Sequence, residues 1–155
     1  MKRRLLTPFI SFLILILLLF LSHAQTYKVE RVVNGDTLLL TNGERVRLIG
    51  VDTPETKHPE KPVEYFGKEA CQFTRGLVEG KEVRLEYDQT RRDIFNRILA
   101  YAYLMDGTFL NAEIIKQGYG FAYTKHPFKH MEEFRQYERE AREAREAQRG
   151  LWKRN

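Results

Sequence analysis

The stretch over residues 27–51, YKVERVVNGDTLLLTNGERVRLIGV, decides the fold. Its apolar residues fall into three short runs, and an Asn-Gly pair, which favours tight hairpin turns, separates each run from the next. The sequence therefore predicts strands over Tyr27–Val33, Thr37–Thr41 and Arg45–Val51, joined as an antiparallel meander.

The remainder of the chain continues the β pattern and adds helices. Alternating apolar residues predict a fourth strand over Val83–Tyr87, and Ile98–Leu104 is typical of a fifth. Helical spacing predicts helices over Tyr65–Val78, Phe109–Lys116 and Met131–Arg149. One helix after the third strand and helices at the end are typical of a five-stranded barrel of the oligonucleotide-binding (OB) type. We expect an α+β fold, mainly a β barrel, with about three packed helices.

The first 24 residues have the pattern of a signal peptide. Basic residues at 2–4 precede an apolar run over 9–21, and Ser22-His23-Ala24 offers small residues for cleavage after Ala24. We therefore expect a signal peptide over 1–24 and one domain over 25–155, exported to the periplasm or the medium. An uncleaved membrane anchor is the alternative, although the run is short for a span, which needs roughly 20 residues.

Composition limits the function less than the placement of charges does. The whole chain has a net charge of +5, but three of its 26 basic residues and none of its 21 acidic ones lie in the signal segment, so the mature domain carries +2. That small charge does not by itself predict a nucleic-acid binder. A single cysteine, Cys71, excludes an intramolecular disulfide, and the histidines have no zinc-site spacing.

Acidic residues occur where the predicted hairpin brings strand ends together. Asp36 opens the second strand, and Asp52 and Glu55 follow the third. Because these strands are antiparallel neighbours, we expect the three carboxylates at one rim of the barrel. They would repel one another unless a cation lay among them, and a hard cation such as Ca²⁺ prefers oxygen ligands. The alternative is that Asp36 is an ordinary turn residue.

Two arginines supply the matching positive charge. Arg47 lies on the third predicted strand, and Arg97 precedes the fifth. Guanidinium groups bind phosphate oxygens in pairs and stay charged at any relevant pH. A phosphodiester gains negative charge in its transition state, so we expect both arginines and a divalent cation to converge on one phosphorus. Surface ion pairs are the alternative for either arginine taken alone.

Three segments of the sequence resemble the staphylococcal (micrococcal) nuclease, or thermonuclease, family. They are Val32–Thr37, Arg47–Thr56 and Asp93–Arg97, and their order, spacing and residue types all agree with that family. The similarity continues through Lys57–Pro59 and Gly67–Ala70, so it covers nearly all of the mature chain.

The resemblance implies a role for each matched residue of the acidic segments. Asp36 and Asp52 would be the carboxylate ligands of a calcium ion, and Thr53 would offer its backbone carbonyl as a third ligand. Glu55 would orient the attacking water and deprotonate it.

The resemblance also implies how substrate is bound. Arg47 and Arg97 would hold the phosphate and stabilise its transition state. Phe95 and Tyr123 would contact the nucleotide, where a base could stack on Tyr123. A core position is the alternative for Tyr123.

The activity that the resemblance implies is that of a calcium-dependent, sugar-nonspecific endonuclease. It would hydrolyse DNA and RNA between phosphorus and the 5′ oxygen and leave 3′-phosphate ends. We expect a preference for single strands, a monomer, no obligate protein partner, and membrane contact only through the signal segment. A non-catalytic nucleic-acid-binding OB module is the alternative; it predicts the loss of Glu55 or of an acidic ligand, and the sequence keeps these residues.

The chain departs from the family pattern at four positions. Asn34 stands where the best-known member has an aspartate near the metal, Ile94 and Phe95 replace a lysine and a tyrosine, and Asn96 replaces a glycine. We expect the first change to weaken calcium binding modestly. The others should alter nucleotide affinity more than catalysis.

Overall fold

The structure is a computed structural model that describes residues 25–56 and 64–146. The predicted signal peptide lies outside the described residues, as do residues 57–63 and 147–155. Within the part of the chain that is described, no helix is both long and apolar enough to cross a membrane.

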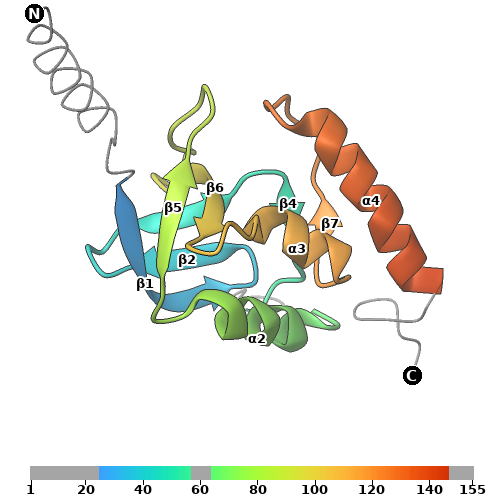
Figure 1. Cartoon of the computed structure of the whole chain (residues 1–155), viewed down its shortest axis with the longest axis horizontal. Helices are drawn as coiled ribbons and strands as arrows, with labels where there is room; N and C mark the ends of the chain where they lie inside the picture. The colour runs from blue at the N-terminus through green and yellow to red at the C-terminus, as the bar shows by residue number, and fades with distance from the viewer. Residues whose placement is uncertain (1–24, 57–63, 147–155) are drawn as a thin grey trace, which may run out of the picture.

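Five strands close into a barrel in the order β1-β2-β3-β6-β5 (Figure 1). Strands β1, β2 and β3 pair antiparallel as the predicted meander, β3 and β6 pair parallel, and β5 pairs antiparallel with both β6 and β1. The predicted five-stranded OB-type barrel is therefore confirmed. The bounds are β1 Thr26–Asn34, β2 Thr37–Leu40, β3 Arg45–Leu48, β5 Glu82–Glu86 and β6 Ile98–Leu104.

Among the described residues, three helices pack around the barrel, as predicted (Figure 1). They are α2 Gly67–Val78, α3 Leu110–Lys116 and α4 Met131–Glu146. Helix α2 begins at Gly67 and not at the predicted Tyr65, because Phe66 has a left-handed backbone (φ 65°) that a helix cannot continue through. The predicted end of the last helix, Arg149, lies outside the described residues.

The predicted third strand over Arg45–Val51 is wrong as one continuous element. Strand β3 ends at Leu48, and β4 (Val51–Asp52) pairs with the unpredicted β7 (Phe121–Ala122) in a separate two-stranded sheet. The chain turns between β3 and β4 at Gly50, whose φ of +72° favours glycine. A Cβ on Gly50 would lie 2.2 Å from a ring carbon of Phe134, so a side chain cannot be accommodated there.

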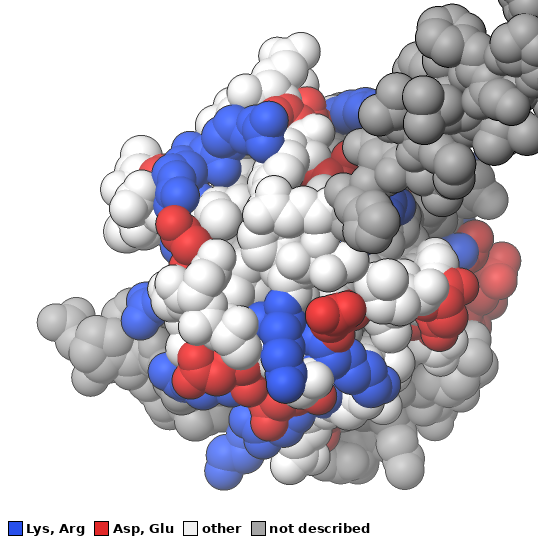
Figure 2. Space-filling model, turned by 60° about the vertical axis from the view of Figure 1, so that its left-hand side comes forward, with Lys and Arg blue, Asp and Glu red and all other residues white. Residues whose placement is uncertain are grey.

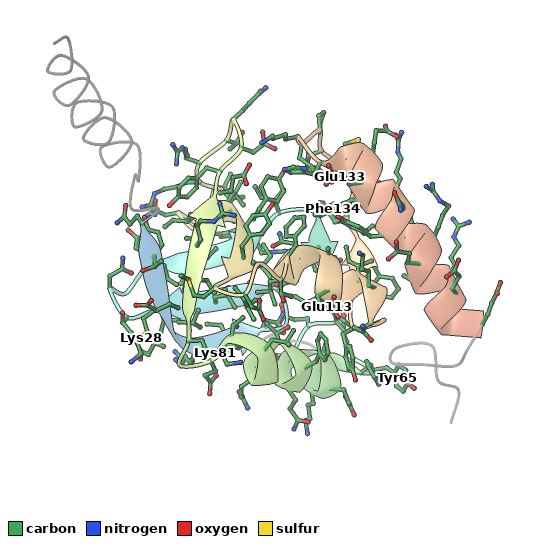
Figure 3. The ribbon with its side chains drawn as sticks, viewed as in Figure 1. Lys28, Tyr65, Lys81, Glu113, Glu133 and Phe134 are labelled. Atoms are coloured by element: carbon green, nitrogen blue, oxygen red, sulfur yellow. The ribbon has the colours of Figure 1, made fainter. Side chains whose placement is uncertain are left out.

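One apolar core fills the barrel and the space beneath the helices. Phe134 projects from α4 toward the barrel and is fully buried (Figure 3). Cys71 is buried in α2 and packs as a small residue of this core. The largest fully buried side chains besides Phe134 are Tyr101, Leu38, Leu40, Leu48, Leu110, Ile114 and Ile115. This core fixes the strand ends on which the acidic residues lie.

Candidate active site

Asp36 is a buried carboxylate at the start of β2. Its exposed fraction is only 4%. Its Oδ1 accepts a hydrogen bond from the Thr37 hydroxyl (2.9 Å), and its Oδ2 accepts one from the Thr53 backbone N–H (3.0 Å). Both oxygens are thus fixed in direction, and the second bond ties the β1–β2 turn to the residue after β4.

Arg47 joins the two aspartates into one cluster. Strand pairing puts Arg47 opposite Thr37, the neighbour of Asp36. Its Nη2 lies 3.3 Å from Asp36 Oδ2 and 3.2 Å from Asp52 Oδ1. Its Nη1 donates to two backbone carbonyls, those of Leu48 and Val51, at the bend between β3 and β4. The guanidinium is therefore held on both sides, and we call Asp36, Arg47 and Asp52 the aspartate–arginine cluster.

Asp52 is the more accessible carboxylate of the aspartate–arginine cluster. Its side chain is about half exposed at the end of β4. Partial burial raises its pKa; the charge of Arg47 opposes that shift, and the charge of Asp36 adds to it. A cation placed beside Asp52 would favour its ionised form, because opposite charge stabilises a carboxylate.

The donor atoms around the cluster suit a hard cation. Thr53 is buried, and its hydroxyl Oγ1 has no hydrogen-bond partner among the described residues. A Cβ on Gly35 would lie 2.8 Å from that hydroxyl, so the glycine is what allows the Thr53 side chain to pack directly against the β1–β2 turn. The described residues contain no group of three or more His, Cys, Asp or Glu that could hold a metal. A cation here would therefore need carbonyl, hydroxyl or water oxygens in addition to Asp36 and Asp52, which calcium accepts.

Glu55 is held by a second group of residues beside the same turn. Its Oε1 accepts hydrogen bonds from Asn34 Nδ2 (3.1 Å) and from the Thr56 backbone N–H (2.9 Å). Asn34 ends β1, two residues before Asp36. All three predicted carboxylates therefore lie near the β1–β2 turn, and Asp36 and Asp52 share the Arg47 guanidinium.

Arg97 lies immediately before β6 and is held within its own loop. Its Nε lies 2.7 Å from Asp93 Oδ2, while Asp93 Oδ1 accepts the backbone N–H groups of Phe95 and Arg97. Asn96 adopts a left-handed conformation (φ 60°) that closes this turn. Burial raises the pKa of Asp93, but the hydrogen bonds and charge of Arg97 outweigh it and keep that pKa below its ordinary value.

Arg47 lies on β3 and Arg97 lies just before the adjacent strand β6, and no contact between the two is seen among the described residues. Strands β3 and β6 are parallel, with Arg47 in register with Leu99, so Arg97 lies two residues before that position. Among the described residues, the Arg97 guanidinium contacts Asp93 and the ring of Phe95, and not the aspartate–arginine cluster.

The two aromatic residues expected at the nucleotide lie at the surface. Phe95 is 73% exposed, and the Arg97 guanidinium carbon lies 5.4 Å from its ring centre. Tyr123 follows β7, its backbone N–H donates to the Gly50 carbonyl (2.9 Å), and Lys125 Nζ lies 5.7 Å from its ring centre. Tyr123 is half-buried and does not belong to the core, so the core alternative is wrong.

Sequence reasoning missed three polar residues that hold the expected site residues. Asn34 and Thr56 bond to Glu55, and Asp93 bonds to Arg97. A signal exists only for Asp93, because an aspartate four residues before an arginine in a polar loop is well placed to pair with it. The partners of Glu55 come from segments that only the fold brings together.

Charge is mixed on the surface of the barrel. On the face shown in Figure 2, Lys and Arg side chains alternate with Asp and Glu around a mostly uncharged area. No field of one sign covers that face. On this face, a phosphate would therefore be attracted by local groups and not by a broad basic surface.

Comparison with known proteins gives concordant matches. A family model described as "Staphylococcal nuclease homologue" matches residues 45–154. The chain is 40% identical over 124 residues to a thermonuclease of Staphylococcus hyicus (77% of this chain, 73% of that protein). It is 46% identical over 99 residues to a thermonuclease of Staphylococcus intermedius (62% and 58%). It is 35% identical over 132 residues to an SPbeta prophage-derived endonuclease of Bacillus subtilis, covering 81% of this chain and 43% of that relative.

Proposed function

We propose that this chain, which belongs to the staphylococcal nuclease family and is therefore a nuclease, is a calcium-dependent, sugar-nonspecific endonuclease. It would hydrolyse phosphodiester bonds of DNA and RNA between phosphorus and the 5′ oxygen, leaving 3′-phosphate ends. The observation that carries this proposal is the aspartate–arginine cluster with Glu55 held beside the same turn.

Calcium would be held by Asp36, Asp52 and the backbone carbonyl of Thr53. When bound, it would add positive charge at the phosphate and at the attacking water. The support is an all-oxygen donor set whose two carboxylates already share one cationic group. Because only two of these ligands are charged, we expect modest affinity, which suits the calcium levels outside cells.

Glu55 would act as the general base. The water oxygen would bond to phosphorus while one water proton passes to the Glu55 carboxylate. The 5′ oxygen would leave with the electrons of its bond to phosphorus and take up a proton from solvent, to which Glu55 then returns its own. Two hydrogen bonds to Oε1 support this role, because they fix the direction of the carboxylate before substrate arrives.

Arg47 and Arg97 would bind the phosphate and stabilise the charge that develops on its oxygens. A guanidinium remains charged and offers paired donors to phosphate oxygens. Recognition through phosphate makes little use of base edges or of the sugar, which explains why one site would accept both DNA and RNA.

Phe95 and Tyr123 would contact the nucleotide. Stacking of a base on an aromatic ring contributes roughly 1–3 kcal/mol per base and tolerates any sequence. The support for Phe95 is its exposure beside Arg97. Unpaired bases are available for such contacts, so single strands should be preferred.

We also propose that the protein is exported and acts as a monomer without an obligate protein partner. Residues 1–24 would be removed as a signal peptide, leaving the domain over 25–155 in the periplasm or the medium. The support is the basic, apolar and small-residue pattern of that segment. Sequencing the mature N-terminus tests it: a first residue at Gln25 supports cleavage, and an intact Met1 in a membrane fraction contradicts it.

Digestion of an end-labelled single-stranded DNA tests the proposed function. With calcium we expect fragments that carry 3′-phosphate ends, and with excess chelator we expect none. Glu55→Gln is the matched variant, because it keeps the shape of the side chain and should lower turnover by about 10²- to 10⁴-fold. Equal cleavage with and without chelator would contradict the metal assignment, and wild-type turnover in Glu55→Gln would contradict the general base.

A further inference from the structure

Asn34 makes a direct contact with the proposed general base. It is 7% exposed at the end of β1, and its Nδ2 donates to Glu55 Oε1 at 3.1 Å. Its Oδ1 accepts from the Thr56 hydroxyl at 3.0 Å, and the Thr56 backbone N–H donates to the same Glu55 oxygen at 2.9 Å. Three residues therefore form a closed hydrogen-bonded group.

The chemistry of this group requires an amide at position 34. A carboxylate oxygen only accepts hydrogen bonds, so the group facing Glu55 Oε1 must be a donor. The opposite amide orientation would bring Asn34 Oδ1 against Glu55 Oε1, two acceptors at hydrogen-bond distance. An aspartate at this position, as in the best-known family member, could not donate and would place a second carboxylate against Glu55.

The backbone of Glu55 is fixed separately from its side chain. Its N–H donates to Glu64 Oε2 (3.0 Å), and its carbonyl accepts the Glu64 N–H (3.0 Å). The carbonyls of Pro54 and Glu55 both pack closely against Gly67 at the start of α2. Loss of the Asn34 contact would therefore remove one of the two hydrogen bonds described for Glu55 Oε1 and loosen the aim of the carboxylate, while leaving the chain path in place.

We propose that Asn34 is a positioning residue for Glu55, acting with Thr56 to aim the carboxylate at the attacking water. This inference rests on the proposed function, because it assigns Asn34 a role only through the general base. Asn34 stands where the best-known family member has an aspartate. The replacement would therefore change how the general base is held, in addition to removing a charge near the metal.

Kinetics of Asn34→Ala and of the isosteric Asn34→Asp, with calcium and single-stranded DNA, test this role. We expect kcat to fall about 10- to 100-fold, because a misplaced catalytic group costs rate, while KM stays within about threefold. Thr56→Val, which keeps the backbone N–H, should lower kcat less. Asn42→Ala is the matched control, because Asn42 belongs to the other Asn-Gly turn and its side chain accepts from the Glu44 N–H. The kcat of this variant should be unchanged.

A double-mutant cycle separates positioning from folding. If Asn34 acts through Glu55, Asn34→Ala should change kcat little in a Glu55→Asp background, whose shorter side chain no longer reaches the amide. Full, additive loss in both backgrounds would overturn the inference, as would wild-type kcat in both Asn34 variants. Wild-type protein that fails to cleave would remove the proposed function and this inference with it, whereas normal cleavage by both Asn34 variants removes the inference alone.

Discussion

The two arginines proposed for one phosphate are supported very differently. Arg47 lies on a barrel strand, is 16% exposed as a side chain, and contacts two aspartates and two backbone carbonyls. Arg97 lies at the end of the loop between β5 and β6, is 27% exposed, and is paired within that loop with Asp93. Arg47 is thus part of the folded barrel, while Arg97 depends on a local turn.

This difference implies that one side of the site is built into the core and the other is added by a loop. Changes at Arg47 should affect stability and catalysis together, since a buried carboxylate depends on it. Changes around Arg97 should affect catalysis and leave the barrel intact. Substitutions in the two regions should therefore separate stability from catalysis.

Arg47→Ala should have the largest effect, because it should lower both turnover and stability. Loss of a phosphate-binding cation should lower kcat by about 10³-fold. Removing the partner of buried Asp36 should also lower the free energy of unfolding in chelator by about 3 kcal/mol. Calcium should restore part of that loss, because it would neutralise the same carboxylates. Kinetics measure the change in kcat, and denaturant titrations with and without calcium measure the change in stability. Unchanged stability would contradict the assigned role of Arg47 in the fold.

Arg97→Ala should reduce catalysis alone. We expect kcat to fall by about 10²-fold, since the variant removes one donor to the transition state. The midpoint of denaturant unfolding should stay close to that of the wild type, because the described contacts of Arg97 are confined to its loop. Destabilisation as large as that of Arg47→Ala would contradict the contrast between the two regions.

Asp93→Asn should have a smaller effect that does not depend on pH. The asparagine retains an oxygen for the backbone N–H groups but loses the charge that fixes Arg97, so we expect about a tenfold lower kcat. The pKa of Asp93 is lower in the folded protein than in the unfolded chain, where it is about 3.9. The contribution of Asp93 to the free energy of unfolding is therefore present above that value and is lost as pH falls through the lower folded pKa. The ratio of wild-type to variant kcat should therefore be constant between about pH 6 and 9. A ratio that changes severalfold over that range would contradict this account.

Arg92→Ala should have the smallest effect and serves as the control for Arg97→Ala. Arg92 belongs to the same loop, where its exposed guanidinium pairs with Glu44 and also donates to the Asn96 carbonyl. Exposed pairs contribute little, so we expect kcat within about twofold of the wild type and an unchanged unfolding midpoint. A loss that matches Arg97→Ala would show that any arginine in the loop, and not Arg97 specifically, serves the phosphate.

Much of the barrel could be predicted from the sequence because its signals are local. The two Asn-Gly turns fix the β1–β2–β3 meander, and alternation marks β5 and β6. The split between β3 and β4 could not be predicted, because it depends on Phe134 packing against Gly50 from far along the chain. Strand β7, two residues long, has no periodicity to detect.

The expected site residues could be named from the sequence, but their supports could not. Asp36 and Asp52 were expected together, and the structure places both on Arg47. The contact of Asn34 with Glu55 depends on the path of residues 53–56 after β4, which no turn signal specifies. The lack of direct contact between Arg97 and the aspartate–arginine cluster also follows from a loop conformation that residue types alone do not determine.

Crystals of the Glu55→Gln protein, soaked with calcium and a non-hydrolysable dinucleotide, test whether metal and phosphate meet at the aspartate–arginine cluster. We predict an anomalous peak about 2.3–2.6 Å from carboxylate oxygens of Asp36 and Asp52 and from the Thr53 carbonyl. The phosphate should lie against the guanidinium of Arg47. A calcium ion bound elsewhere, or a phosphate remote from Arg47, would contradict the account.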